Sequence, residues 1–146
     1  MTPVEKLEER FLPLCANAKD QLVSIYPKYN FHIWSSSVGG ATTLQGHNLG
    51  LEVRFPEADP EDANTVAIVI GLRHLTTEPE IDDVSVSWGV GVAPTEGTEI
   101  VEEPVFFNEA NLKRIEKEFP TLLDAFEKAI AAYSDKESNL NGPPAA

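Results

Sequence analysis

Carboxylate side chains are the most concentrated chemical groups in this sequence. The segment from Glu57 to Glu103 holds twelve acidic residues and a single base, Arg73, so its formal charge is −11 of the −13 carried by the whole chain. Clustered carboxylates can bind cations, transfer protons during catalysis or attract a positively charged partner. The twelve residues are Glu57, Asp59, Glu61, Asp62, Glu78, Glu80, Asp82, Asp83, Glu96, Glu99, Glu102 and Glu103.

The spacing of these carboxylates excludes an EF-hand, though not irregular calcium binding, and argues against acid–base catalysis. Segments 59–64 and 78–83 place acids at alternate positions, but neither has the sixth-position glycine or the twelfth-position glutamate of an EF-hand. Acid–base catalysis needs two carboxyl groups held in a cleft with pKa values shifted apart, which acids on exposed turns rarely achieve. The pattern therefore favours either attraction of a basic partner or simple solvation of turns.

Motifs for nucleophilic catalysis, phosphate binding and zinc binding are also missing from the sequence. Ser87 has Ser85 where a nucleophile elbow requires glycine. Gly89 and Gly91 are not followed by a third glycine at the required spacing, and no Gly-Lys-Ser or Gly-Lys-Thr occurs. The three histidines have no paired spacing. The sequence predicts a non-enzymatic protein without a metal or a cofactor.

Composition and charge indicate the compartment and exclude some partners. The single cysteine, Cys15, falls on an apolar helical stripe and is expected to be a buried thiol. Nothing at the N-terminus has the form of a signal peptide, and the longest apolar run, Val66 to Leu72, is far shorter than the ~20 residues of a membrane span. The negative charge opposes binding to nucleic acids and to anionic lipid surfaces. We expect a cytoplasmic protein.

Two amphipathic helices are predicted, one near each end of the sequence. The first begins at Thr2-Pro3-Val4-Glu5, which has the grammar of a capping box, and ends before Pro27. The second is capped by Asn108 or Asn111 and carries an apolar stripe as far as Tyr133.

Breaker residues modify these helices. Pro13 and Pro120 fall inside the two helical patterns, so we expect each helix to be kinked or broken at its proline. From Asp135 onward the apolar periodicity ends, which predicts a mobile tail over residues 135–146. The remaining residues, 1–134, are expected to form a single domain.

Five strands are predicted between the helices. Alternating apolar residues indicate strands at 29–35, 49–55 and 84–90, a continuously apolar run indicates a central strand at 65–72, and a weaker edge strand is expected at 99–107. A long, flexible connection is expected between the first two strands. Short connections elsewhere favour an antiparallel meander, so the fold class is α+β with the order α-β-β-β-β-β-α.

The placement of the helices decides which surface of the sheet is open. If both helices lie on one side, the opposite face forms a partly apolar binding surface; if one lies on each side, that face is closed. Trp88 shares its strand face with valines and is expected in the core, whereas Trp34 is the candidate for an exposed anchor. The open face would carry His32, Trp34, Glu52, Arg54, Ser85 and Ser87.

The leading functional hypothesis is an immunity-type inhibitor that neutralises a basic protein partner, such as a toxin or a nuclease. Trp34 would anchor the partner, and the acidic residues would steer it. The steering residues are Asp59, Glu61, Asp62, Glu78, Glu80, Asp82, Asp83, Glu99, Glu102 and Glu103.

Two other hypotheses remain open. One is an accessory subunit or chaperone of a larger assembly, which would bury the open sheet face. The other is a small-ligand-binding protein or enzyme with a pocket between sheet and helices that uses His32, Glu52 and Arg54. The sequence leaves the oligomeric state open, including a homo-oligomer.

Overall fold

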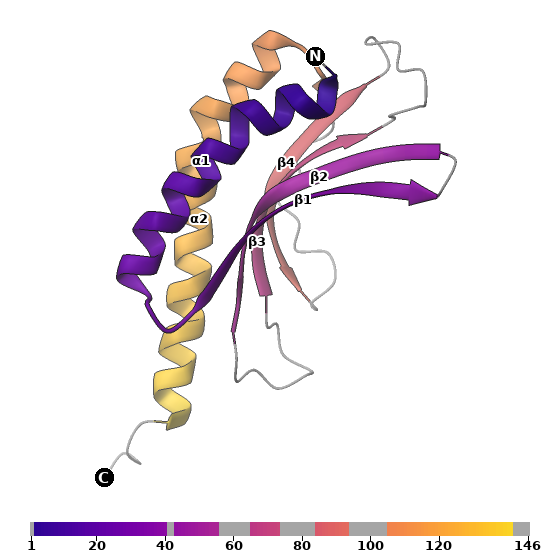
Figure 1. Cartoon of the computed structure of the whole chain (residues 1–146). Helices are drawn as coiled ribbons and strands as arrows, with labels where there is room; N and C mark the ends of the chain where they lie inside the picture. The colour runs from indigo at the N-terminus through magenta and orange to yellow at the C-terminus, as the bar shows by residue number, and fades with distance from the viewer. Residues whose placement is uncertain (1, 41–42, 56–64, 74–83, 94–104, 142–146) are drawn as a thin grey trace.

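Figure 1 presents the computed structural model, which describes residues 2–40, 43–55, 65–73, 84–93 and 105–141. The five strands form one antiparallel sheet in the order β1-β2-β3-β4-β5. The predicted α+β class, with a five-strand meander between two helices, is confirmed. The elements are α1 (Pro3–Ile25), β1 (Asn30–Gly40), β2 (Thr43–Arg54), β3 (Thr65–Arg73), β4 (Ser85–Ala93), β5 (Val105–Phe106) and α2 (Glu109–Asn141).

The helix caps follow from local side-chain chemistry. Thr2 Oγ1 accepts a hydrogen bond from the Glu5 backbone N–H at 3.1 Å, and the Glu5 side chain accepts from the Thr2 backbone N–H. This reciprocal pair confirms the predicted capping box. At α2, Asn108 Oδ1 accepts from the Asn111 N–H at 2.9 Å, so Asn108 is the capping residue of the two candidates.

Both helices continue through their internal prolines. The predicted break at Pro13 or Pro120 does not occur, and the predicted kink is not confirmed. Both proline side chains are exposed. On the exposed side of a helix, water can replace the hydrogen bond that a proline removes from the carbonyl group four residues earlier, here that of Glu9 or Glu116.

The C-terminal helix is longer than predicted. α2 extends to Asn141, beyond Asp135, where the sequence predicts that the tail begins. Once a helix is nucleated, each further residue adds a hydrogen bond at little cost, so loss of the apolar stripe need not end it. A tail without helix cannot begin before residue 142. Residues 142–146 lie outside the described residues, and mobility of the tail stays a prediction.

The first hairpin also extends further than predicted. β1 continues to Gly40 and β2 begins at Thr43, where the sequence predicts strands ending at 35 and beginning at 49. The two strands pair from Asn30 opposite Arg54 to Gly40 opposite Thr43. Pairing across the hairpin supplies backbone hydrogen bonds that override the weak intrinsic strand preference of serine and glycine.

Both helices pack on the same face of the sheet (Figure 1). α1 covers β1 and β2, and α2 covers β3 and β4. On this inner face the register aligns Leu49 with Ile70 and Ile70 with Trp88, and all three side chains are at most 3% exposed. The structure thus selects the first of the two arrangements that the sequence left open. No described helix or strand packs on the opposite face.

The core between sheet and helices contains both side chains that the sequence predicts to be buried there. Trp88 is 3% exposed, and its indole N–H donates to Glu118 Oε2 on α2 at 2.9 Å. The Cys15 thiol on α1 is fully buried. Burial raises the pKa of this thiol to about 11, because the low-polarity surroundings disfavour the thiolate. Both predictions are confirmed.

Aromatic contacts join the second half of α2 to the first two strands. Tyr133 stacks on Phe55 with ring centroids 3.7 Å apart, and Tyr29 meets Phe55 edge to face at 5.2 Å. Phe126 lies beside Phe31 of β1 at 6.5 Å. Since an earlier turn of α2 bonds to Trp88 on β4, this helix crosses the inner face of the sheet obliquely.

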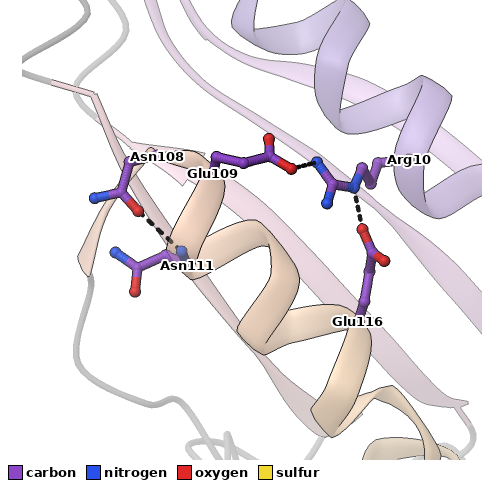
Figure 2. A network of polar contacts seen from close by, with 5 residues as sticks. All are labelled: Arg10, Asn108, Glu109, Asn111 and Glu116. Carbon is purple, nitrogen blue, oxygen red and sulfur yellow. Dashed lines mark hydrogen bonds and ion pairs between the residues drawn. The ribbon is translucent and has the colours of Figure 1, made fainter.

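A polar contact fixes the N-terminal ends of the two helices relative to each other (Figure 2). Arg10 of α1 points between two carboxylates of α2: its Nη1 lies 2.6 Å from Glu109 Oε1, and its Nε donates to Glu116. Arg10 is 25% exposed and Glu109 is 61% exposed, so solvent screens the pairs. Exposed ion pairs contribute only about 0–1 kcal/mol each, so their main effect is to orient the parallel helices.

Candidate functional site

The face of the sheet turned away from the helices is the candidate site. We call it the outer face. Its central row runs from Trp34 on β1 through Gly50 and Val69 to Gly89 on β4, as the register pairs these residues in turn. The outer face is defined by Asn30, His32, Trp34, Asn48, Gly50, Glu52, Arg54, Ala67, Val69, Gly71, Arg73, Ser85, Ser87, Gly89 and Gly91.

A glycine allows the indole of Trp34 to lie against the sheet. A Cβ built on Gly50 would overlap the backbone carbonyl oxygen of Ile68 and would stand 2.8 Å from Trp34 Cη2. Any side chain at position 50 would therefore lift the indole away from the strand beneath it. Trp34 is half-buried in this position. The indole of the predicted anchor is thus positioned by its close approach to Gly50, and its role in binding stays a prediction.

A second long side chain, that of Arg73 at the C-terminal end of β3, lies across the outer face. Arg73 Nη1 donates to Asn48 Oδ1 at 2.8 Å and to the Leu72 carbonyl oxygen at 3.0 Å. A Cβ built on Gly71 would stand 2.7 Å from the same nitrogen. The single base of the acidic segment is therefore held against the outer face by neutral acceptors.

Two serines of β4 complete this part of the outer face. Ser87 is 6% exposed, and Ser85 lies opposite Arg73 in the register. The Ser85 hydroxyl oxygen is buried and has no hydrogen-bond partner among the described residues. On the other side of Ser85 is Phe106 of β5, which is 69% exposed. The region combines hydroxyl groups with an exposed aromatic ring.

The three residues proposed for a small-ligand pocket lie on the outer face as well. His32 pairs with Glu52 in the register, and the Arg54 Nη2 atom lies 3.9 Å from Glu52 Oε1. His32 and Arg54 are exposed. Because the pleat alternates side chains between the two faces, these residues cannot line a pocket between the sheet and the helices. That part of the small-ligand hypothesis is corrected.

The predicted acidic residues lie in connections 56–64, 74–83 and 94–104, outside the described residues. Their attachment points are nevertheless placed. Connection 56–64 leaves Arg54 and returns at Thr65, its register partner, whereas connection 74–83 begins after Arg73, at the opposite end of β3. Only the ends of these connections are described, so the role of these acids in steering a partner stays a prediction. The residues concerned are Asp59, Glu61, Asp62, Glu78, Glu80, Asp82, Asp83, Glu99, Glu102 and Glu103.

The sequence did not reveal that the side chains of Trp34 and Arg73 lie over Gly50 and Gly71. The available signal was glycine inside strand patterns, at positions 50, 71 and 89, where it marks close approach of another group. Nor did it identify the pairing of Arg73 with Asn48. Both depend on strand register, which brings residues 25 positions apart into contact.

A buried histidine lies in a separate polar cluster on the inner face. Ser35 Oγ donates to Glu8 Oε2 at 3.0 Å and lies 2.6 Å from His47 Nε2, while Ser37 Oγ lies 3.1 Å from His47 Nδ1. Since the Ser35 hydroxyl gives its one hydrogen to Glu8, the ring donates from Nε2 and accepts at Nδ1 from Ser37. The hydrogen-bond chain satisfies a neutral imidazole, and it links α1 to the first hairpin.

Burial lowers the pKa of His47 below its ordinary value of 6.5, and the Glu8 carboxylate opposes this in part. The unfolded chain therefore binds a proton more readily than the folded one. The contribution of His47 to stability is present above about pH 6.5 and is lost as the pH falls through the folded pKa.

We expect the free energy of unfolding of wild type to fall between about pH 7 and 5 more steeply than that of His47→Gln. Urea unfolding at a series of pH values measures this difference in slope. The matched control is His32→Gln, the same exchange at an exposed position. Equal slopes for wild type and His47→Gln would contradict the expectation.

Other features of the described residues are less suited to recognition of a partner or ligand. A groove of about 370 Å³ between the N-terminal ends of the helices is lined by four charged residues and Leu112, and two of the charged residues, Arg10 and Glu109, pair with each other. Within the described ranges, no group of three histidine, cysteine, aspartate or glutamate side chains is placed to hold a metal ion. Likewise, no described helix has the length and apolarity needed to cross a bilayer.

The outer face is therefore the described surface best suited to recognition: it combines an oriented indole, a fixed guanidinium and small residues that let a partner approach the backbone. Comparison with models of protein families, with curated proteins and with solved structures finds no match to this chain.

Proposed function

We propose that this protein is a non-enzymatic binding module that captures a basic protein partner on the outer face of its sheet, as an immunity-type inhibitor does. The observation that carries the proposal is the placement of both helices on one side of the sheet. A sheet with one face packed and the other free of described elements offers a broad surface for a partner. In this role the protein catalyses no reaction.

Charge supports a basic partner. The chain has a formal charge of −13, and the connections at the two ends of β3 carry eight of the twelve acidic residues between positions 57 and 103. A partner approaching the outer face would meet an attractive field from either end. Such steering accelerates encounter and fixes orientation, whereas apolar contact at the centre supplies most of the affinity.

Trp34 is the central anchor in this proposal. Tryptophan is enriched among interface residues that dominate binding, and an indole already oriented by its support loses little entropy on binding. The half-buried ring beside Gly50 meets both conditions. A reducing cytoplasm is the compartment that we propose, because it suits the free Cys15 thiol.

The first step of the test is to capture partners on the immobilised full chain from an extract of the cells that produce it, at low salt, with elution by a salt step. The eluted protein is then purified and titrated against the chain. We expect Trp34→Ala to weaken binding by about tenfold or more. Ile25→Ala is the matched control, because Ile25 is 60% exposed but lies on α1, away from the outer face; it should leave the affinity unchanged.

Salt dependence separates this proposal from an accessory subunit that uses the same face. The affinity should fall steeply with ionic strength, since the screening length shrinks from about 10 Å at 0.1 M to about 3 Å at 1 M. Loss of affinity on Trp34→Ala without salt dependence would favour the accessory subunit. A partner bound equally well by wild type and Trp34→Ala would contradict docking on the outer face.

A further inference from the structure

We infer that two copies of this chain pair through the free edge of β1 and the adjoining flank of α1. This surface is distinct from the outer face, so the inference does not depend on the proposed function. The flank consists of Glu8, Leu12, Ala16, Lys19 and Val23, which recur at intervals of three or four residues and so share one side of the helix.

β1 is an edge strand without the usual protection against pairing. It is eleven residues long, and its sequence from Asn30 to Gly40 contains no lysine, arginine, carboxylate or proline. Its only irregularity falls late, between Val38 and Gly39. Edge strands of stable monomers are normally short, charged, bulged or covered, so a long neutral edge is suited to adding another strand. Among the described strands, only β2 pairs with β1.

The flank of α1 lies on the same side as this edge. Glu8 bonds to Ser35 of β1, whereas Arg10, about 200° further around the helix, bonds to α2. The flank therefore faces away from α2 and towards the β1 edge. Leu12 and Ala16 are half-buried, and Val23 is 41% exposed, so the flank retains apolar surface beside the open strand.

The distance between neighbouring strands and the distance between packed helices are compatible with a two-fold symmetric dimer. α1 contacts both β1 and β2, and a helix axis midway between these two strands would lie half a strand spacing inside β1. Antiparallel pairing of β1 with its copy puts a two-fold axis half a spacing outside β1. With strands ~4.8 Å apart, the two α1 axes would lie ~9.6 Å apart. Helices pack at about 8–10 Å, so one operation brings both strands and helices to contact distance.

The charge pattern of the flank is self-complementary. Glu8 precedes and Lys19 follows the apolar pair Leu12 and Ala16, so in an antiparallel arrangement each glutamate faces the lysine of the other copy. Lys19 forms no ion pair among the described residues. An axis midway between Glu8 and Lys19 crosses β1 on the Asn30 side of Ser35, before the irregularity.

Net charge permits this contact. Residues 1–56, which include α1, β1 and β2, hold five acids and five bases, whereas the remainder of the chain holds the whole charge of −13. Two copies can approach through the neutral half with little repulsion. A second copy related by a two-fold axis covers both the β1 edge and the flank of α1 in one interface.

The test is sedimentation equilibrium of the full chain over a range of concentrations. Wild type should be a dimer that dissociates on dilution. Val23→Lys should raise the dimer dissociation constant by about tenfold or more, because each contact at a two-fold interface is lost twice. The matched control is Asn17→Lys, which adds the same charge at an exposed position on another side of α1 and should leave the constant unchanged.

Amide hydrogen exchange locates the interface. In the wild-type dimer, outward amides within Asn30–Val38 should be protected, and Val23→Lys at the same concentration should expose them. Far-UV circular dichroism checks that the variant keeps its fold. A monomeric wild type at every concentration would overturn the inference, as would a dimer that Val23→Lys leaves intact or that leaves the β1 amides unprotected.

Discussion

Gly50→Ala is expected to lower the free energy of unfolding by ~3 kcal/mol or more. Replacing glycine by alanine inside a strand normally raises stability by about 0.5–1 kcal/mol. A loss of stability on Gly50→Ala would therefore show that the added methyl group does not fit. The added methyl group would overlap the Ile68 carbonyl oxygen, which belongs to the central strand of the sheet. A backbone group paired on both sides cannot move aside without disturbing its neighbours. Urea unfolding followed by circular dichroism measures the change.

Gly71→Ala is the matched comparison for Gly50→Ala. Its methyl group would meet the side-chain atoms Asn48 Oδ1 and Arg73 Nη1, which can rotate away. We expect a loss of only about 1 kcal/mol, mainly from the broken hydrogen bond between these two side chains. Equal losses for the two variants would mean that the backbone approach at Gly50 is not the controlling contact.

Phe126→Ala is expected to cost about 3–5 kcal/mol of unfolding free energy. Phe126 is fully buried in the middle of α2 and lies beside Phe31 of β1. Deletion of the ring removes its contacts and leaves a cavity that helices held at both ends cannot close. Chemical denaturation of the purified variant measures the loss.

Phe106→Ala serves as the control for Phe126→Ala. It deletes the same ring at a position that is 69% exposed, so the change should stay within about 0.5 kcal/mol. A small effect at Phe126 would indicate that the region between α2 and β1 can repack. A large effect at Phe106 would indicate that this ring is covered in solution.

Features that depend on neighbouring residues were predictable from the sequence. The capping box at Thr2 and Glu5 and the end of α1 before Pro27 follow from contacts within one helical turn. Alternation also placed His32, Trp34, Glu52 and Arg54 on one face of the sheet, because the pleat reverses the side-chain direction at every residue. The continuous apolar run over β3 also predicted an interior strand, and β3 lies at the centre of the sheet.

Features that depend on contacts between distant residues were not predictable. The side on which each helix packs is set by how the whole chain closes its core, and alternation alone is the same for both arrangements. The extent of the first hairpin depended on pairing that local strand preference does not describe. At the candidate site, Trp34 was predicted as an exposed residue, but its support by Gly50 requires the register between β1 and β2.

The oblique path of α2 has a consequence for the order of folding. This helix follows all five strands in the chain, yet it supplies the partners of Trp88 on β4 and of Phe31 on β1. During synthesis the meander leaves the ribosome with the inner faces of β3 and β4 still exposed. The core can close only when α2 emerges, so synthesis of this helix completes the cooperative unit.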